Sequence, residues 1–168
     1  IGRLEKIKGF DLLITSWKNV RTNLIIIGSG KEKNKLNELI QQNNLSEKVK
    51  IIDEVRREEL LNYYQDASVL IISSRDEGGP RVALEALYLE IPVISTDVGH
   101  MSQILPKELL VEKNNQAALQ NMLEKYVDNI HLYNQKGIFN FIETEFSLEE
   151  KMKELNEAYD FLINLDIN

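Results

Sequence analysis

Two glutamates with a glycine-containing turn between them are the strongest candidates for chemistry in this sequence. Glu77 follows the end of an apolar run and precedes Gly78-Gly79, whereas Glu85, eight positions later, stands within the apolar stretch Val82–Leu87. A glutamate is almost never fully buried unless it is paired. An ionised carboxylate suits a pair of hydroxyl donors, at roughly 1.5–3 kcal/mol net per hydrogen bond to a charged group. We therefore expect both acids to bind hydroxyl groups of a ligand.

Two cations, Arg3 and Lys8, lie in the first loop of the chain, and Gly9 follows them at the start of a predicted helix. A helix N-terminus offers free N–H groups and the positive end of its dipole, and side-chain charge adds to both. The loop therefore suits a diphosphate. The alternative is two surface cations that pair with Glu5 or Asp11, and the loop alone leaves both open. Together with the two acids, the cations indicate a nucleotide-sugar.

The turn between the acids is built for close approach of a ligand. Gly78-Gly79 lets the backbone come near another molecule, and Pro80 suits the first turn of a helix, where a missing N–H costs little. The alternative for Glu77 is a solvated loop acid. For Glu85 it is an ion pair with Arg81, worth only about 0.3–0.5 kcal/mol. The presence of all these residues at the strand ends of one sheet favours the binding role.

Other readings of the charged and glycine-rich residues are weaker. A glycosidase pair needs two carboxylates that face each other across a sugar bond, which one strand-helix unit does not offer. Gly28-Ser29-Gly30 lacks the third glycine of a dinucleotide fingerprint, because Lys33 stands there. We interpret it as a tight turn in which Gly30 can still admit a ligand to the backbone. His100 can approach the same ligand, although a lone histidine is more often structural.

The pattern of apolar residues predicts alternating strands and helices. Short β-branched runs predict strands, and apolar residues at 3.6-residue spacing predict helices. The predicted strands are Asn23–Ile27, Val49–Ile52, Ser68–Ser74, Pro92–Thr96 and Leu109–Val111. The predicted helices are Gly9–Val20, Lys31–Asn43, Glu58–Ala67, Arg81–Leu89 and a short one near Ser102.

This alternation, with strands that are apolar on both faces, predicts an α/β fold: a doubly wound, Rossmann-like parallel sheet with helices on both sides. Ligands of such sheets bind outside the carboxyl ends of the strands. The site is therefore expected in the loops that follow Gly2, Ile27, Ile52, Ser74 and Thr96.

The chain from Asn115 onward is expected to be helical. Predicted helices cover Ala117–Val127, a segment around Leu132–Glu145, and Leu148–Leu165, which a capping box opens. We expect one domain, residues 1–168, with an α/β core over about 1–112 and a helical tail over 113–168. Because Ile1-Gly2-Arg3-Leu4 resembles the end of a buried strand, we expect the chain to be a fragment whose N-terminal part was removed.

The composition excludes several classes of function. A net charge of -7 argues against a nucleic-acid binder, and no apolar run approaches the length of a membrane span. The absence of cysteine excludes disulfides and thiolate metal sites, and it fits a reducing compartment. With only two histidines, His100 and His131, a histidine-rich metal site is impossible. No signal peptide is visible at the start.

Taken together, the loops resemble the nucleotide-sugar-binding domain of family 4 glycosyltransferases, the retaining members of the glycosyl transferases group 1. The similarity extends over roughly Gly2 to Leu105 and several motifs recur in the right order. The matching segments are Gly2-Arg3-Leu4 with Lys8-Gly9-Phe10, Ile26-Ile27-Gly28-Ser29-Gly30, Ser74 with Glu77-Gly78 through Leu84-Glu85-Ala86-Leu87, and Pro92-Val93-Ile94-Ser95-Thr96-Asp97-Val98-Gly99.

The resemblance implies roles for individual residues. Arg3 and Lys8 would neutralise the donor diphosphate and stabilise the departing nucleotide diphosphate. Glu77 would be the first acid of the E-x7-E motif, which contacts the donor sugar, and Glu85 the second, which binds the ribose. The implied catalytic residues are Arg3, Lys8 and Glu77. The implied nucleotide-sugar-binding residues are Arg3, Lys8, Gly30, Val55, Arg56, Glu77, Gly78, Gly79, Pro80, Arg81, Val82 and Glu85.

The resemblance also implies a larger enzyme. Such GT-B glycosyltransferases have two Rossmann-like domains, and this chain corresponds to the second, without the acceptor domain, so that alone it is expected to be inactive. We expect a retaining hexosyltransferase of polysaccharide biosynthesis that moves a sugar from a UDP- or GDP-sugar to a glycan or lipid-linked acceptor. It would need no metal or other cofactor. We expect a cytoplasmic location, with peripheral association at the inner face of the membrane.

Two departures from the family pattern leave the sugar open. The sequence has Glu77-Gly78-Gly79-Pro80-Arg81 where Glu-Gly-Phe-Gly is common, and Arg81 is a candidate for selecting the sugar. His100 stands where a second glycine is common. The alternatives that we keep are a non-catalytic nucleotide-binding or assembly module and half of a nucleotide-sugar epimerase.

Overall fold

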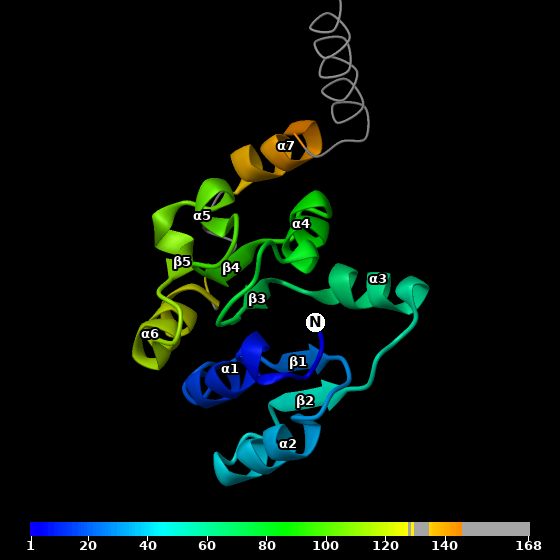
Figure 1. The fold of residues 1–168 in the computed structure, drawn as a ribbon, viewed down its shortest axis with the longest axis vertical. Coiled ribbons are helices and arrows are strands. Elements are labelled where there is room, and N and C mark those ends of the chain that lie inside the picture. Colours follow the sequence, from blue (N-terminus) through cyan, green and yellow to red (C-terminus); the bar gives the residue numbers. More distant parts are fainter. Residues whose placement is uncertain (128, 130–134, 146–168) are drawn as a thin grey trace, which may run out of the picture.

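Two sets of parallel strands with helices around them make up the fold (Figure 1). The computed structural model describes residues 1–127, 129 and 135–145. The strands are β1 (Leu24–Ile27), β2 (Val49–Ile52), β3 (Leu70–Ile72), β4 (Val93–Thr96) and β5 (Leu110–Val111). The helices are α1 (Phe10–Ser16), α2 (Lys33–Gln42), α3 (Arg57–Asp66), α4 (Arg81–Tyr88), α5 (Met101–Ile104), α6 (Gln116–Tyr126) and α7 (Lys136–Glu145), with 3-10 turns at Lys6–Lys8 and Lys107–Leu109.

The predicted alternation of strands and helices is confirmed, and so are the α/β class and the parallel direction of all paired strands. Some of the predicted elements differ from the observed ones at their ends. The strand predicted over Ser68–Ser74 is shorter in the structure, which has Leu70–Ile72; beyond its end, the Ser73 hydroxyl donates to the Lys8 carbonyl and the Ser74 hydroxyl to the Glu77 carboxylate. The helix predicted over Leu148–Leu165 and the residue His131 lie outside the described residues.

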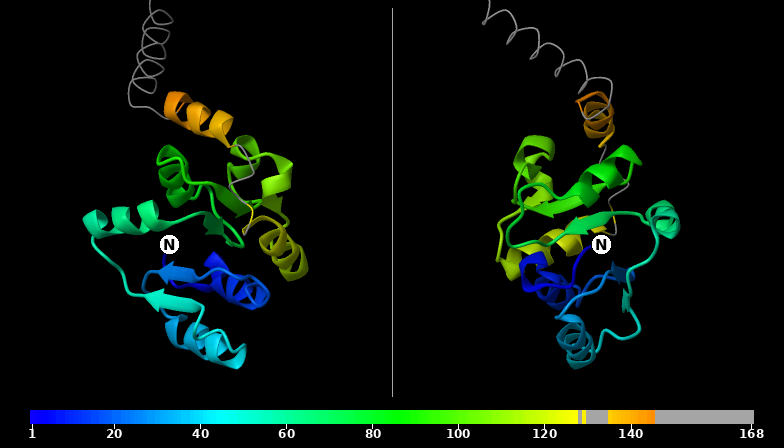
Figure 2. Two further views of the ribbon diagram at one scale, coloured as in Figure 1. Left: turned by 180° about the vertical axis from the view of Figure 1, so that it is seen from behind. Right: turned by 45° about the vertical axis from the view of Figure 1, so that its right-hand side comes forward.

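The strands form two separate sheets rather than the single sheet that the alternation predicts. β1 pairs with β2, with Leu24 opposite Val49, and β3, β4 and β5 form the other sheet in that order. Among the described residues, β1 is hydrogen-bonded to β2 and β3 to β4, and no strand pairing joins β1 to β3. In each view of Figures 1 and 2, the N-terminal residue lies between them.

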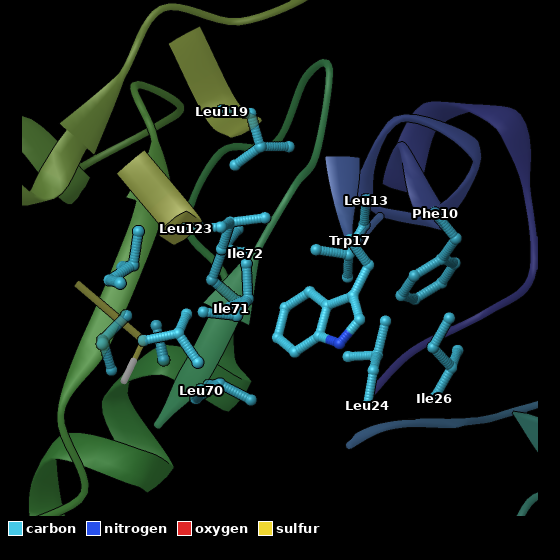
Figure 3. Close-up of a cluster of buried hydrophobic side chains, with 14 of the residues drawn as sticks. Phe10, Leu13, Trp17, Leu24, Ile26, Leu70, Ile71, Ile72, Leu119 and Leu123 are labelled. Carbon is cyan, nitrogen blue, oxygen red and sulfur yellow. The ribbon is translucent and has the colours of Figure 1, made fainter. Parts of the chain in front are cut away.

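The largest side chains of the core lie where the two sheets meet. Trp17 of the α1 end is only 2% exposed, and its ring lies between Leu24 of β1 and the β3 residues Leu70 and Ile71 (Figure 3). Its indole N–H donates to the Thr22 carbonyl at 2.9 Å. Burying such an aromatic side chain contributes on the order of 3 kcal/mol. Since α1 also contacts α2 and α6, this helix ties the two sheets together.

The described helices are all short or polar on one face. None of them combines the length and the apolar character that a membrane-spanning helix needs.

Candidate functional site

The loops at the carboxyl ends of the strands meet, as the fold class predicts. We call residues 2–9, 28–32, 53–56, 73–80 and 97–100 the first to fifth loops. A Cβ on Gly30 of the second loop would lie 2.5 Å from the Leu4 carbonyl oxygen of the first. Ser29 donates to Glu54 of the third loop at 3.2 Å. Gly99 of the fifth loop packs on the carbonyl of Gly78 in the fourth.

Lys8 and Glu77 form an ion pair at the centre of these loops. Their side chains are only 23% and 14% exposed, and Ser74 donates from its hydroxyl to the second carboxylate oxygen of Glu77 at 2.9 Å. A cation and an acid that are 69 positions apart in sequence therefore share one small volume. The prediction that the first and fourth loops belong to one site is in accord with this contact.

Arg75 fixes the loop that carries Lys8. Its guanidinium makes a bidentate ion pair with Asp11 at 2.7 and 2.8 Å, and it donates to the Lys6 carbonyl at 2.6 Å. Burial by itself would raise the pKa of Asp11, but the hydrogen bonds and charge of Arg75 outweigh it and hold that pKa below its usual value. In the same region the Ser73 hydroxyl donates to the Lys8 carbonyl at 3.0 Å. The backbone at Lys8 is thus tied to the end of β3 from several sides.

Gly9 makes this attachment sterically possible. It has a left-handed conformation with φ of 65°, and a Cβ at this position would lie 1.9 Å from the Ser73 carbonyl oxygen. Only glycine adopts that conformation without strain and leaves room for the neighbouring backbone. The first loop can therefore reach the end of β3 only because residue 9 has no side chain.

Arg3 takes a different place from Lys8. Its side chain is 75% exposed and pairs with Glu5 at 3.1 Å, which is one of the two surface pairings that are the alternative to a diphosphate site. Asp11, the other candidate partner, binds Arg75 instead. Arg3 lines a cavity of about 230 Å³ together with Gly28, Ser29, Glu54 and Val55. The structure therefore does not join Arg3 to Lys8, and Arg3 borders the part of the site near the second and third loops.

Glu85 is held by a residue that sequence reasoning missed. The phenol of Tyr64 in α3 donates to a carboxylate oxygen of Glu85 at 2.9 Å. Tyr64 is 4% exposed, and burial first, then the hydrogen bond and charge of Glu85, raise its pKa far above the ordinary value. The alternative of an Arg81–Glu85 ion pair is not formed between these two described residues. Glu85 is exposed in the structure, and among the described residues it is Tyr64 that orients one of its carboxylate oxygens.

The glycine turn leaves open space beside these acids. A Cβ on Gly78 would meet no atom within 4 Å, and one on Gly79 would come within 3.2 Å of the His100 ring nitrogen Nδ1. Pro80 is buried and Arg81 is exposed, while Val82 is half-buried. His100 therefore borders the glycine turn from the fifth loop.

Two further predicted residues lie at the rim. Val55 lines the cavity of about 230 Å³ described above. Arg56 instead turns toward α3, where it pairs with Glu59. In the described part of the chain, no cluster of three or more histidine, cysteine or acidic side chains is arranged to hold a metal ion.

Comparison with known proteins connects this geometry with one family. The family described as "Glycosyl transferases group 1" matches residues 1–137. An uncharacterized glycosyltransferase, MJ1178 of Methanocaldococcus jannaschii, is 31% identical over 140 residues, which are 82% of this chain and 40% of the relative. The amylovoran biosynthesis glycosyltransferase AmsD of Erwinia amylovora is 31% identical over 139 residues, 74% of this chain and 39% of the relative.

A solved structure supports the fold. Anabaena Alr3699/HepE in complex with UDP and glucose superposes with a TM-score of 0.84 at 16% identity, over 95% of this chain and 47% of that one. The chain spans about two fifths of the length of the curated relatives that it matches.

Proposed function

The chain belongs to the glycosyl transferases group 1 family, and from that membership we propose that it is the donor-binding domain of a retaining glycosyltransferase. The observation that carries the proposal is the meeting of Lys8 with Glu77 where the first and fourth loops join. A diphosphate needs a cation and a sugar needs a hydrogen-bond acceptor, and the two lie side by side in the fold. The known binding of UDP by HepE supports a nucleotide-sugar as the ligand.

In the proposed complex, Lys8 and Glu77 exchange partners. Without donor the two charges neutralise each other, which avoids an unpaired charge in a largely covered site. With donor, the Lys8 ammonium binds the diphosphate and the Glu77 carboxylate accepts hydrogen bonds from the sugar hydroxyls. When the bond to the sugar breaks, negative charge grows on the leaving nucleotide diphosphate. Lys8, with Arg3 at the rim, stabilises that charge, so no metal is required.

The other parts of the donor occupy the neighbouring surfaces. The cavity beside Gly28 and Val55 takes the base, which the backbone of the second and third loops contacts. Glu85 accepts hydrogen bonds from the ribose hydroxyls. The Tyr64 phenol keeps one of its oxygens occupied and so directs the other toward the ligand. The remaining binding residues are those of the turn, Gly78, Gly79, Pro80, Arg81 and Val82, with Gly30 and Arg56 at the edge.

For the whole protein, we propose transfer of a hexose with retention of anomeric configuration to a glycan or lipid-linked acceptor in polysaccharide biosynthesis. The similarity to AmsD, an amylovoran biosynthesis glycosyltransferase, supports the role in polysaccharide biosynthesis. The acceptor would bind on a further domain, and this chain by itself would not transfer sugar. A cytoplasmic location at the inner membrane face belongs to the same proposal, because nucleotide-sugars are its donor class.

Substitution of the two acids tests the division of roles. We expect Glu85→Ala to weaken binding of UDP or GDP about 10- to 100-fold, because it removes one or two hydrogen bonds to a charged group. We expect Glu77→Ala to leave nucleotide binding unchanged or slightly tighter, since it frees Lys8, and to abolish discrimination among sugars. Titration calorimetry with nucleotides and nucleotide-sugars measures both effects.

The matched control for these variants is Glu38→Ala, an exposed acid on α2 far from the loops. It should bind every ligand like the parent chain. If Glu85→Ala and Glu77→Ala also bound nucleotide and nucleotide-sugar like the parent, the assignment of ribose and sugar to these acids would be wrong.

A further inference from the structure

The cavity of about 230 Å³ lies where β1 and β2 end. Ile27 of β1 stands opposite Ile52 of β2 in the parallel register, so the second and third loops leave the sheet side by side. The Gly28 N–H donates to the Ile52 carbonyl at 3.0 Å and continues this pairing past β1. Pockets that enclose a whole drug-sized ligand have roughly 300–1,000 Å³. The smaller cavity therefore suits one part of a larger ligand, which in the proposed complex is the base.

The wall of this cavity combines apolar side chains with two charged ones. The apolar side chains are Ile27, Val55 and Leu60. The charged ones are Arg3 and Glu54, and Arg3 already pairs with Glu5. In a ligand site of this kind the apolar wall covers the ligand, and the few polar groups decide which ligand fits. Glu54 is therefore the side chain of the wall to which we look for base selection.

Glu54 is held in place without a cation. Its neighbour Asp53 pairs with Lys33, but none of the ion pairs among the described residues includes Glu54. The contact that it does make is with Ser29 of the second loop, whose hydroxyl donates to Oε2 at 3.2 Å. This hydrogen bond orients the carboxylate across the two loops that border the cavity and leaves its charge unneutralised.

The third loop therefore offers hydrogen-bond acceptors beside a donor. An ionised carboxylate only accepts, and its two oxygens can take two parallel N–H donors. Oε1 of Glu54 accepts no hydrogen bond from a described residue, and Oε2 has a further lone pair. Val55 lines the same cavity, and within the described part of the chain its backbone N–H donates to no other group. A base that fits has two adjacent donors next to an acceptor.

Among the common bases, guanine has this arrangement. Its Watson–Crick edge presents the N1–H and the 2-amino group side by side, with the O6 acceptor next to them. Uracil has one N3–H between two carbonyl oxygens, so one of these oxygens would face the carboxylate and be repelled. Adenine and cytosine each have one amino donor beside a ring nitrogen that accepts. A carboxylate thus favours guanine by attraction and disfavours uracil by repulsion.

We propose that Glu54 selects guanine and that the donor is accordingly a guanosine diphosphate sugar. The N1–H and the 2-amino group of the base donate to the Glu54 carboxylate, and the Val55 N–H donates to O6. Ser29 keeps the carboxylate at the cavity. The inference rests on the proposed function, because it assigns the base to this cavity, and it adds the identity of that base.

The test is titration calorimetry of the chain with GDP, UDP and inosine diphosphate, which has the N1–H of guanine but lacks its 2-amino group. We expect GDP to bind at least about tenfold more tightly than UDP and about tenfold more tightly than inosine diphosphate, because a hydrogen bond to a charged group is lost.

Glu54→Gln isolates the carboxylate. Glutamine keeps an oxygen for the Ser29 hydroxyl, but it has no charge and places an amide donor against one of the guanine donors. We expect the affinity for GDP to fall about 10- to 100-fold and that for UDP to change less than about twofold. The matched control is Glu58→Gln, an exposed acid in the first turn of α3, which should bind all three nucleotides like the parent.

Three results would overturn the inference while leaving the proposed function intact, because in each a nucleotide still binds. These are UDP binding as tightly as GDP, equal affinities for GDP and inosine diphosphate, and a preference for GDP that Glu54→Gln does not reduce. Failure of all three nucleotides to bind would contradict the proposed function itself, and the inference with it. The two kinds of failure are therefore distinguished in one set of titrations.

Discussion

Replacing Lys8 by methionine is expected to weaken binding of a nucleoside diphosphate about 100-fold. Methionine keeps most of the length of the side chain but removes the charge. The change deletes the ammonium that would bind the diphosphate. It also leaves Glu77 without its cation, so that a carboxylate only 14% exposed would then repel the incoming phosphates. Titration calorimetry with UDP and GDP measures the loss.

Lys6→Met is the matched control for this prediction. Lys6 lies in the same 3-10 turn, but its side chain is exposed and the structure uses only its backbone carbonyl, which accepts from Arg75. This variant should bind like the parent. Equal affinities for the parent, Lys6→Met and Lys8→Met would show that Lys8 does not contact the diphosphate. A double variant, Lys8→Met with Glu77→Gln, should recover part of the loss, because the unpaired negative charge is removed.

Gly9→Ala is expected to have the largest effect on stability, a loss of at least about 3 kcal/mol in the free energy of unfolding. The φ of 65° strains any residue with a Cβ, and the added atom would lie 1.9 Å from the Ser73 carbonyl oxygen. The only relief is to move the first loop away from β3, which would separate Lys8 from Glu77. Urea denaturation of the variant measures the stability, and its nucleotide affinity should fall with it.

Two other glycines supply the controls. Gly78→Ala adds a Cβ that meets no atom within 4 Å, and its stability should stay near that of the parent. Gly137→Ala lies in α7, has equally open surroundings, and should gain about 1 kcal/mol from the better helix propensity of alanine. A Gly9→Ala chain that unfolds at the parent's midpoint would contradict the steric role of Gly9.

Much of the fold could be predicted because it depends on local patterns. The run Val49–Ile52 became β2 with the predicted bounds, and the spacing of apolar residues located α1 through α4 to within a few positions. The rule that parallel strands gather their carboxyl-end loops then placed Lys8 and Glu77 in the same region. Their direct contact follows from the meeting of the first and fourth loops at the strand ends.

The side-chain contacts that orient the site could not be predicted, because they join distant segments without any periodic signal. Arg75 binds Asp11 across 64 positions, and Tyr64 binds Glu85 across 21. In the sequence, a tyrosine on the apolar face of a helix has the same pattern of neighbours whether its ring only packs in the core or its phenol also donates a hydrogen bond. The close approach of the Leu4 backbone to Gly30 is another contact between distant loops that no local pattern indicates.

The separation into two sheets could not be predicted from the sequence either. Strand-helix alternation implies parallel strands but not which strands are neighbours, so a single sheet was the simplest expectation. The order of pairing depends on contacts such as that of Trp17 with β1 and β3, which form only in three dimensions.

The most direct test of the central claim is a calorimetric titration of the chain with UDP, GDP and the corresponding sugar nucleotides in the presence of EDTA. The central claim is that the loops at the strand ends bind a nucleotide diphosphate sugar without a metal. We expect saturable binding of one nucleotide and its sugar derivative, in a competitive manner, with EDTA making no difference. No binding by any of these compounds at millimolar concentration, or binding only after addition of a divalent cation, would contradict it.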